Sequence, residues 1–211
     1  MATANRALVL VDIQQEYFSG PLEIQFPSPA DSLPKIIEAI DAAEANDIPV
    51  VVVQHADDDE APFFNPTLPG FALHPEIETR RTPAWKSITK QYGSVFAGTD
   101  LLEWLKNNEI ETVTLVGYMT NNCIISSAAE AEVHGIAAEV LSDATGAISI
   151  GNDAGYVDAK TVHTTLMALM NSNFAAVEPT DIWIAALSDG HGLEKDNLPA
   201  SAMSGAQRFS S

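Results

Sequence analysis

The chain has 211 residues, a length that suits one domain, and 46% of its residues are hydrophobic while 18% are charged. Ten Lys and Arg residues stand against 29 Asp and Glu residues, which gives a formal net charge of -19. Such a surface repels phosphate backbones and anionic lipid, so nucleic acid and membranes are excluded as expected partners. No apolar run is long enough to cross a bilayer, and the first residues do not form a secretory signal. Together with the single Cys, this favours a cytoplasmic protein.

Short apolar runs alternate with amphipathic segments in the first half of the chain. Residues 7–14 and 48–55 lack polar alternation, which is typical of strands buried on both faces. Between them, apolar residues recur at helical spacing over about residues 32–46. Residues 56–93 are rich in Pro and acidic residues and show no sustained period, yet they contain several aromatic residues. We predict that this stretch is an ordered binding loop.

The same alternation continues in the second half. Thr99 is the expected N-cap of a helix whose apolar side chains are Leu101, Leu102 and Leu105. A strand over residues 111–117, a helix over 121–134, a strand over 137–144, a helix over 153–171 and a short strand over 174–182 follow. The order predicts an α/β fold: three α/β/α layers with a doubly wound, mostly parallel, Rossmann-like sheet. Residues 1–187 would form the domain, and residues 188–211 a tail that is mobile or reaches a partner subunit.

Two side chains with reactive chemistry follow predicted strands. Asp12 ends the first strand and Cys123 lies just beyond the strand at 111–117. Ligands bind beyond the carboxyl ends of strands in such sheets, so these residues are expected at one edge. At the start of a helix, Cys123 would be favoured as a thiolate, and nearby N–H groups could hold an oxyanion. Equally, Cys123 could fill a gap in the core, as most free cysteines do.

Asp12 also has two interpretations. It could simply terminate its strand, or it could be a partly desolvated carboxylate that requires a cationic partner. Lys86 and Lys90 are the candidates for that partner, because both precede the helix expected after Thr99. The pattern of residues alone does not choose between them.

Three segments carry a resemblance to a known family. "VLVDIQQEYF", "KQYGSVFAGTDL" and "LVGYMTNNCIISSAAEAEVHG", followed by "VLSDA", occur in the order seen in the isochorismatase-like superfamily of cysteine hydrolases. That superfamily includes nicotinamidases, N-carbamoyl amidohydrolases and related amidases. The resemblance extends over about residues 6–177 and implies the α/β/α fold predicted above.

The resemblance also implies a catalytic triad of Asp12, Lys90 and Cys123. Lys90 is preferred over Lys86 because it lies four residues before a Ser-x-Phe sequence, Ser94 to Phe96. The cysteine belongs to a G-x-x-T-x-x-C turn that starts at Gly117 and contains Thr120. A cis peptide bond between Tyr118 and Met119 is implied, with the backbone N–H groups of Met119 and Cys123 as oxyanion donors.

Nicotinamidases resemble one another in an Asp-x-His metal site, and this chain departs from that pattern. His55 and His74 are present without the Asp-x-His spacing, so we expect no catalytic metal and no other cofactor. By position relative to the motifs, the substrate-binding residues would be Tyr17, Phe71, Asn122 and His55, with His74 nearby. Each of these could also be ordinary packing. Gln14 is expected to orient loops around the site.

The function that the resemblance implies is cysteine-dependent hydrolysis of a C–N bond in a small carboxamide or N-carbamoyl (ureido) compound, through a thioester. Two alternatives remain. One is isochorismatase-type hydrolysis of a vinyl ether, whose enzymes commonly lack the cysteine. The other is a non-catalytic protein that binds small molecules, which would lack an abnormally fast reaction of Cys123 with iodoacetamide. A homo-oligomer is expected in each case.

Overall fold

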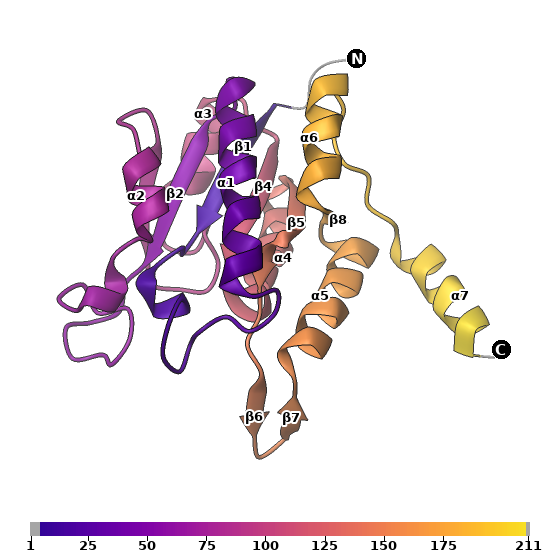
Figure 1. Cartoon of the computed structure of the whole chain (residues 1–211). Helices are drawn as coiled ribbons and strands as arrows, with labels where there is room; N and C mark the ends of the chain where they lie inside the picture. Colours follow the sequence, from indigo (N-terminus) through magenta and orange to yellow (C-terminus); the bar gives the residue numbers. More distant parts are fainter. Residues whose placement is uncertain (1–4, 210–211) are drawn as a thin grey trace.

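The computed structural model describes residues 5–209 and contains a six-stranded parallel sheet with strand order β3-β2-β1-β4-β5-β8 (Figure 1). Residues 1–4 and 210–211, which belong to the predicted domain and tail, lie outside the described residues. The strands of this sheet are β1 (Arg6–Val11), β2 (Val50–His55), β3 (Lys86–Lys90), β4 (Thr112–Tyr118), β5 (Ala137–Gly146) and β8 (Ala176–Glu178). The order doubles back beside β1, as the prediction of a doubly wound sheet requires.

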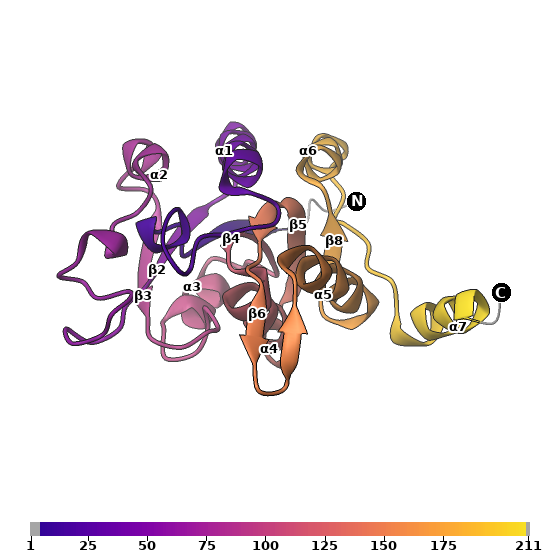
Figure 2. The ribbon, with the colours of Figure 1, turned by 60° about the horizontal axis from the view of Figure 1, so that its bottom comes forward.

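Helices cover both faces of the sheet (Figure 2). The helices are α1 (Pro29–Ala45), α2 (Pro75–Arg80), α3 (Leu101–Asn107), α4 (Ile125–His134), α5 (Ala159–Asn173), α6 (Thr180–Asp189) and α7 (Leu198–Phe209). On one face α1, α2 and α6 pack against the sheet, and on the other α3, α4 and α5 do. Within β1, Leu8 and Leu10 face the first group while Val9 and Val11 face the second. Burial of both faces explains the continuous apolar runs and confirms the three-layer α/β/α prediction.

The predicted loop over residues 56–93 has more regular structure than expected. It contains a short 3-10 helix (Pro69–Phe71), α2 and strand β3. In β3 only Ile88 and Lys90 are buried, because the strand lies at the edge of the sheet. An edge strand has no continuous apolar run, so the pattern sought in the sequence did not reveal it.

Four further features differ from the prediction. The helix expected over residues 153–171 starts only at Ala159, after a hairpin of β6 (Ile150–Asn152) and β7 (Gly155–Val157). Asp158 caps this helix by accepting a hydrogen bond from the Thr161 N–H at 3.1 Å. The strand expected over residues 174–182 shortens to β8 and is followed by α6, and the tail contains α7. Thr99 is one residue too early to be the N-cap of α3, although its hydroxyl accepts from the Leu101 N–H at 3.3 Å.

Among the residues described, no helix combines the length and apolar character needed to cross a membrane.

Candidate active site

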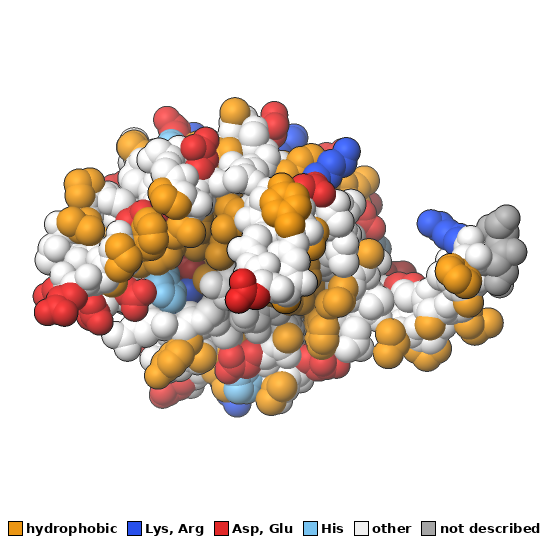
Figure 3. Space-filling view, turned by 90° about the horizontal axis from the view of Figure 1, so that it is seen from below, with side chains coloured by type: hydrophobic (Ala, Val, Ile, Leu, Met, Phe, Trp, Pro, Cys, Tyr) orange, Lys and Arg blue, Asp and Glu red, His pale blue; other side chains and the backbone are white. Residues whose placement is uncertain are grey.

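Three strands bring Asp12, Lys90 and Cys123 together at the carboxyl end of the sheet. Asp12 directly follows β1, Lys90 is the last residue of β3, and Cys123 lies in a π-helical turn (Thr120–Ile124) between β4 and α4. Because all these strands are parallel, their carboxyl ends meet at one edge. Figure 3 looks onto that edge from below and shows a hollow beside a histidine and a basic side chain.

The three side chains are in contact and almost fully buried. Lys90 Nζ lies 2.7 Å from Asp12 Oδ2 and donates a hydrogen bond to Cys123 Sγ at 3.2 Å. The exposed fractions are 0% for Asp12 and 1% for both Lys90 and Cys123. Of the two lysines left open by the sequence, Lys90 is therefore the partner of Asp12. Lys86 instead pairs with Asp100 at the surface.

The contacts of Lys90 leave the carboxylate of Asp12 able to accept a proton. Lys90 Nζ also lies 3.1 Å from His55 Nδ1 and donates to the Tyr92 carbonyl oxygen at 3.1 Å. An ammonium has three N–H donors, and His55, Tyr92 and Cys123 provide three acceptors. The contact with Asp12 is an ion pair, and neither Asp12 oxygen has a hydrogen bond to the described residues.

Burial dominates the ionisation of the cluster. The pKa of Cys123 is raised to about 12, mainly by burial and also by the Asp12 carboxylate, while Lys90 opposes both effects. Burial also raises the pKa of Asp12, again against the effect of Lys90. The expectation that the helix start would favour the thiolate is therefore wrong. Loss of hydration and a neighbouring negative charge outweigh the helix dipole.

One group of side chains has the spacing of metal ligands. The ligand atoms of Asp12, His55 and Cys123 lie within 4.8 Å of one another. Lys90 Nζ contacts all three residues, so an ammonium already occupies the position in which a cation would be bound. Burial and Lys90 both lower the pKa of His55, which keeps its imidazole neutral.

The backbone around the cluster is tightly packed. Gly117 adopts a φ of +107°, and a Cβ atom at this position would lie 2.2 Å from the Val11 carbonyl oxygen. Asp12, the next residue after Val11, itself has a φ of 50°. The peptide bond between Tyr118 and Met119 is cis, as the resemblance implied. The absence of a side chain at Gly117 thus allows β4 to approach the backbone of Val11, which directly precedes Asp12.

Gln14 and Tyr17 connect the loops around the site. The buried Gln14 side chain donates to the carbonyl oxygens of His55 and Phe71 and accepts from the His55 N–H at 2.8 Å. This is the loop-orienting position expected for Gln14. Tyr17 is buried, and its ring centroid lies 5.4 Å from that of Phe64 and 5.7 Å from that of Tyr118.

The other expected pocket residues have different surroundings. Phe71 is partly buried, and its carbonyl oxygen holds the Gln14 amide. Asn122 is exposed and lies beside Gly93. His74 caps α2 by accepting from the Glu76 N–H, and its ring lies 4.3 Å from that of Phe18. Of the histidines considered in the sequence, only His55 contacts the cluster.

His163 on α5 is a residue that the sequence analysis missed. Its Nδ1 lies 3.0 Å from Thr120 Oγ1, in the turn that carries Cys123, and the Phe26 ring lies 5.6 Å away. Burial lowers the pKa of His163 to about 4, so the ring is neutral near pH 7. The available signal was a polar residue among the otherwise apolar residues on the buried side of α5, which are Ala159, Met167 and Met170.

Comparisons with known proteins identify the family to which the chain is similar. A family model described as the isochorismatase domain matches residues 6–182. The isochorismatase family protein YrdC of Bacillus subtilis is 31% identical over 83% of this chain and 92% of its own length. Nicotinamidase/pyrazinamidase of Mycobacterium tuberculosis is 27% identical over 82% of this chain and 97% of its own.

Solved structures show the same fold. A crystal structure of an isochorismatase-like protein from Burkholderia xenovorans LB400 is 39% identical, with a TM-score of 0.95 over 100% of both chains. It therefore spans the tail as well as the sheet. The family match, these relatives and the buried cluster at the end of the sheet lead to one conclusion: the chain belongs to the isochorismatase family of hydrolases.

Proposed function

We propose that this chain is a cysteine-dependent hydrolase that cleaves a C–N bond in a small carboxamide or N-carbamoyl (ureido) compound, with Asp12, Lys90 and Cys123 as its catalytic residues. The observation that carries the proposal is a buried thiol within 4.8 Å of a buried carboxylate, with the Lys90 ammonium in contact with both. A carboxylate so placed is a proton acceptor for the thiol.

The first half of the reaction forms a thioester. Cys123 Sγ gives its proton to Asp12 and attacks the carbonyl carbon of the substrate, while Lys90 stabilises the negative charge on sulfur. The N–H groups of Met119 and Cys123 are the proposed donors to the oxyanion of the tetrahedral intermediate. When the C–N bond breaks, Asp12 returns the proton to the leaving nitrogen.

The second half regenerates the thiol. A water molecule that enters after the amine has left gives one proton to Asp12 and attacks the thioester carbonyl carbon. Collapse of the second tetrahedral intermediate breaks the C–S bond, and Asp12 returns that proton to Cys123. The raised pKa of Asp12 suits this alternation between base and acid.

Two considerations favour a C–N bond over a vinyl ether. The first is that this chain has Cys123, whereas the vinyl-ether hydrolases of the superfamily commonly lack the cysteine. The second is that the relative from Mycobacterium tuberculosis is named as a nicotinamidase/pyrazinamidase. The proposed surroundings of the substrate are Tyr17, Phe71, Asn122 and His55, and a small planar ligand suits such partly aromatic walls. No metal is part of the proposal, and the cytoplasm remains the predicted compartment.

Ammonia release from a panel of small amides and ureides tests the activity. With the best substrate, Cys123→Ala and Asp12→Asn are each expected to reduce kcat at least about 1000-fold, because each removes a group that forms or breaks bonds. Lys90→Met is expected to reduce kcat by a similar factor. Lys86→Met is the matched control, since Lys86 lies in the same strand but pairs with Asp100 at the surface.

The outcomes separate the alternatives. Retention of most of the turnover by Cys123→Ala would contradict the thioester mechanism and would favour vinyl-ether hydrolysis. Binding of panel compounds without any turnover would identify a non-catalytic binding protein. Activity in chelator-washed enzyme that contains stoichiometric zinc would contradict the metal-free mechanism.

A further inference from the structure

Helix α7 is amphipathic, but its apolar side faces away from the rest of the molecule. It projects from the body next to α5 (Figure 1), and a cavity of about 310 Å³ separates the two helices. The α7 residues that line this cavity are small or polar: Ser201, Ser204, Gly205 and Arg208. Leu198, Met203 and Phe209 are 59%, 67% and 94% exposed. Apolar side chains also mark this arm in Figure 3.

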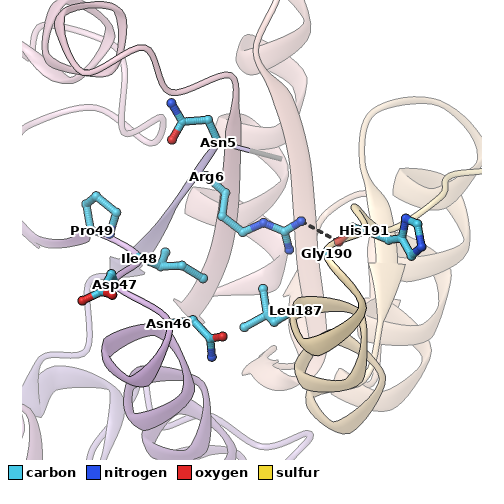
Figure 4. A pocket seen from close by; sticks show the side chains of 9 residues that line it. All are labelled: Asn5, Arg6, Asn46, Asp47, Ile48, Pro49, Leu187, Gly190 and His191. Atoms are coloured by element: carbon cyan, nitrogen blue, oxygen red, sulfur yellow. Dashed lines mark hydrogen bonds between the residues drawn. The ribbon is translucent and has the colours of Figure 1, made fainter. Parts of the chain in front are cut away.

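The tail that leads to α7 is attached to the body at several points. Arg6 Nη2 donates to the His191 carbonyl oxygen at 2.8 Å, at the edge of a cavity of about 430 Å³ (Figure 4). Glu139 Oε1 accepts from the Leu193 N–H at 2.9 Å, and Lys195 Nζ donates to the Asn173 carbonyl oxygen. These contacts fix where the arm leaves the body, so its apolar side has a defined position.

The surface formed by α5 and α7 differs in charge from the rest of the chain. Neither helix contains an Asp or a Glu, although the chain has 29 acidic residues. The nearest acids, Asp158 and Asp196, precede the helices and hydrogen-bond to Thr161 and Ser201. Asp196 lines the cavity between the two helices, on the side away from the exposed apolar residues of α7. Leu169 on α5 adds a further exposed apolar side chain. Depletion of charge around exposed apolar residues is the composition of the core of a protein interface.

We infer that the surface of α5 and α7 is the contact between two copies of this chain, with the apolar side of each α7 buried against the other copy. A basic partner would bind the acidic parts of the surface more strongly than the surface of α5 and α7, because neither helix contains an acidic residue. A second copy carries the same net charge of -19, so the repulsion between two copies is smallest where both lack acidic residues. A twofold dimer uses one such surface twice. This inference is independent of the proposed catalytic function.

Sedimentation equilibrium of the full chain tests the inference. The wild-type chain is expected to be a dimer at micromolar concentration. Met203→Glu is expected to raise the dimer dissociation constant at least about 100-fold, because two carboxylates would be buried in the contact without cations. Met203 is exposed in the monomer, so the variant should keep its circular dichroism spectrum and its turnover.

Ile182→Glu is the matched control. Ile182 is 46% exposed on α6, which packs on the opposite face of the sheet, and the substitution adds the same charge. It is expected to leave the dimer intact. A monomeric wild-type chain, a fully dimeric Met203→Glu variant, or dissociation caused equally by Ile182→Glu would each overturn the inference.

Discussion

Cys123 is as buried as a core residue and also contacts a charged side chain. The sequence left a nucleophile and a residue that fills a gap in the core as alternatives, and burial alone does not separate them, because the thiol is 1% exposed and still contacts Lys90. The resemblance to the isochorismatase-like superfamily favoured Lys90 over Lys86 and implied the cis bond after Tyr118, and the structure contains both the Lys90–Asp12 pair and that bond. The direction of the thiol pKa was not predictable from the sequence, because it depends on how completely the folded chain excludes water.

Alkylation by iodoacetamide is a test at this scale. In the free enzyme the reaction of Cys123 is expected to be slow near pH 7 and to keep rising with pH beyond about 8.5, where an ordinary thiol levels off. The physical reason is the pKa of about 12, which leaves little thiolate at neutral pH. Slow alkylation at neutral pH therefore does not identify a non-catalytic protein, contrary to the expectation from the sequence. The rate of alkylation is measured between pH 7 and 10 by mass spectrometry of samples quenched at set times.

Two variants examine the causes separately. Asp12 raises the pKa of Cys123 and Lys90 lowers it. Asp12→Asn should therefore be alkylated several-fold faster than wild type at pH 8 even though it does not turn over, and Lys90→Met should be alkylated more slowly. Equal rates in all three proteins would mean that access to the sulfur, and not its ionisation, limits the reaction.

Among the strands and helices, those that are buried on both faces were the ones that the sequence predicted best. Strands β1, β2, β4 and β5, buried on both faces, were found as apolar runs, whereas the edge strand β3 was not. The hairpin β6–β7 is exposed along its length, so no apolar period marks it. Helix α7 was missed for another reason: its apolar residues are few and do not contact the core.

The close approach of β4 and β1 at Gly117 leads to a second prediction. Gly117→Ala places a Cβ atom 2.2 Å from the Val11 carbonyl oxygen and imposes a φ of +107° on a residue that disfavours it. We expect the variant to lose about 3 kcal/mol or more of its free energy of unfolding and to lose activity through displacement of Asp12. Denaturant titration checks the stability. In the control, Gly151→Ala, the new Cβ atom meets Tyr156 at an ordinary 3.6 Å.

Burial of His163 where α5 packs against the turn that carries Cys123 predicts that the stability of the chain depends on pH. In the unfolded chain His163 takes up a proton near pH 6.5, but in the folded chain only near pH 4. Between these values protonation favours the unfolded chain, so the free energy of unfolding should fall as the pH decreases from 6.5 toward 4. His163→Asn, which can retain a hydrogen bond to Thr120, should show a shallower decrease in urea titrations across this range. An unchanged slope would show that other groups cause the loss.

At the scale of the whole molecule, the net charge of -19 opposes association. If two copies associate through α5 and α7, which contain no acidic residues, added salt should strengthen the dimer. The salt screens the repulsion between the acidic residues on the rest of the two surfaces. We expect the dissociation constant to fall several-fold between 20 mM and 300 mM sodium chloride, as measured by sedimentation. A dimer held by ion pairs would weaken over the same range.

Lys90 belongs to a five-residue strand at the rim of the sheet, while Asp12 follows the central strand β1. Local unfolding of β3 would move the Lys90 ammonium away from the Cys123 thiol, while the hydrophobic cores on the two faces of the sheet remain folded. Mild heating or low denaturant should thus inactivate the protein before its helical circular dichroism declines. Loss of activity would then report on the opening of one edge strand, β3, and not on unfolding of the whole chain.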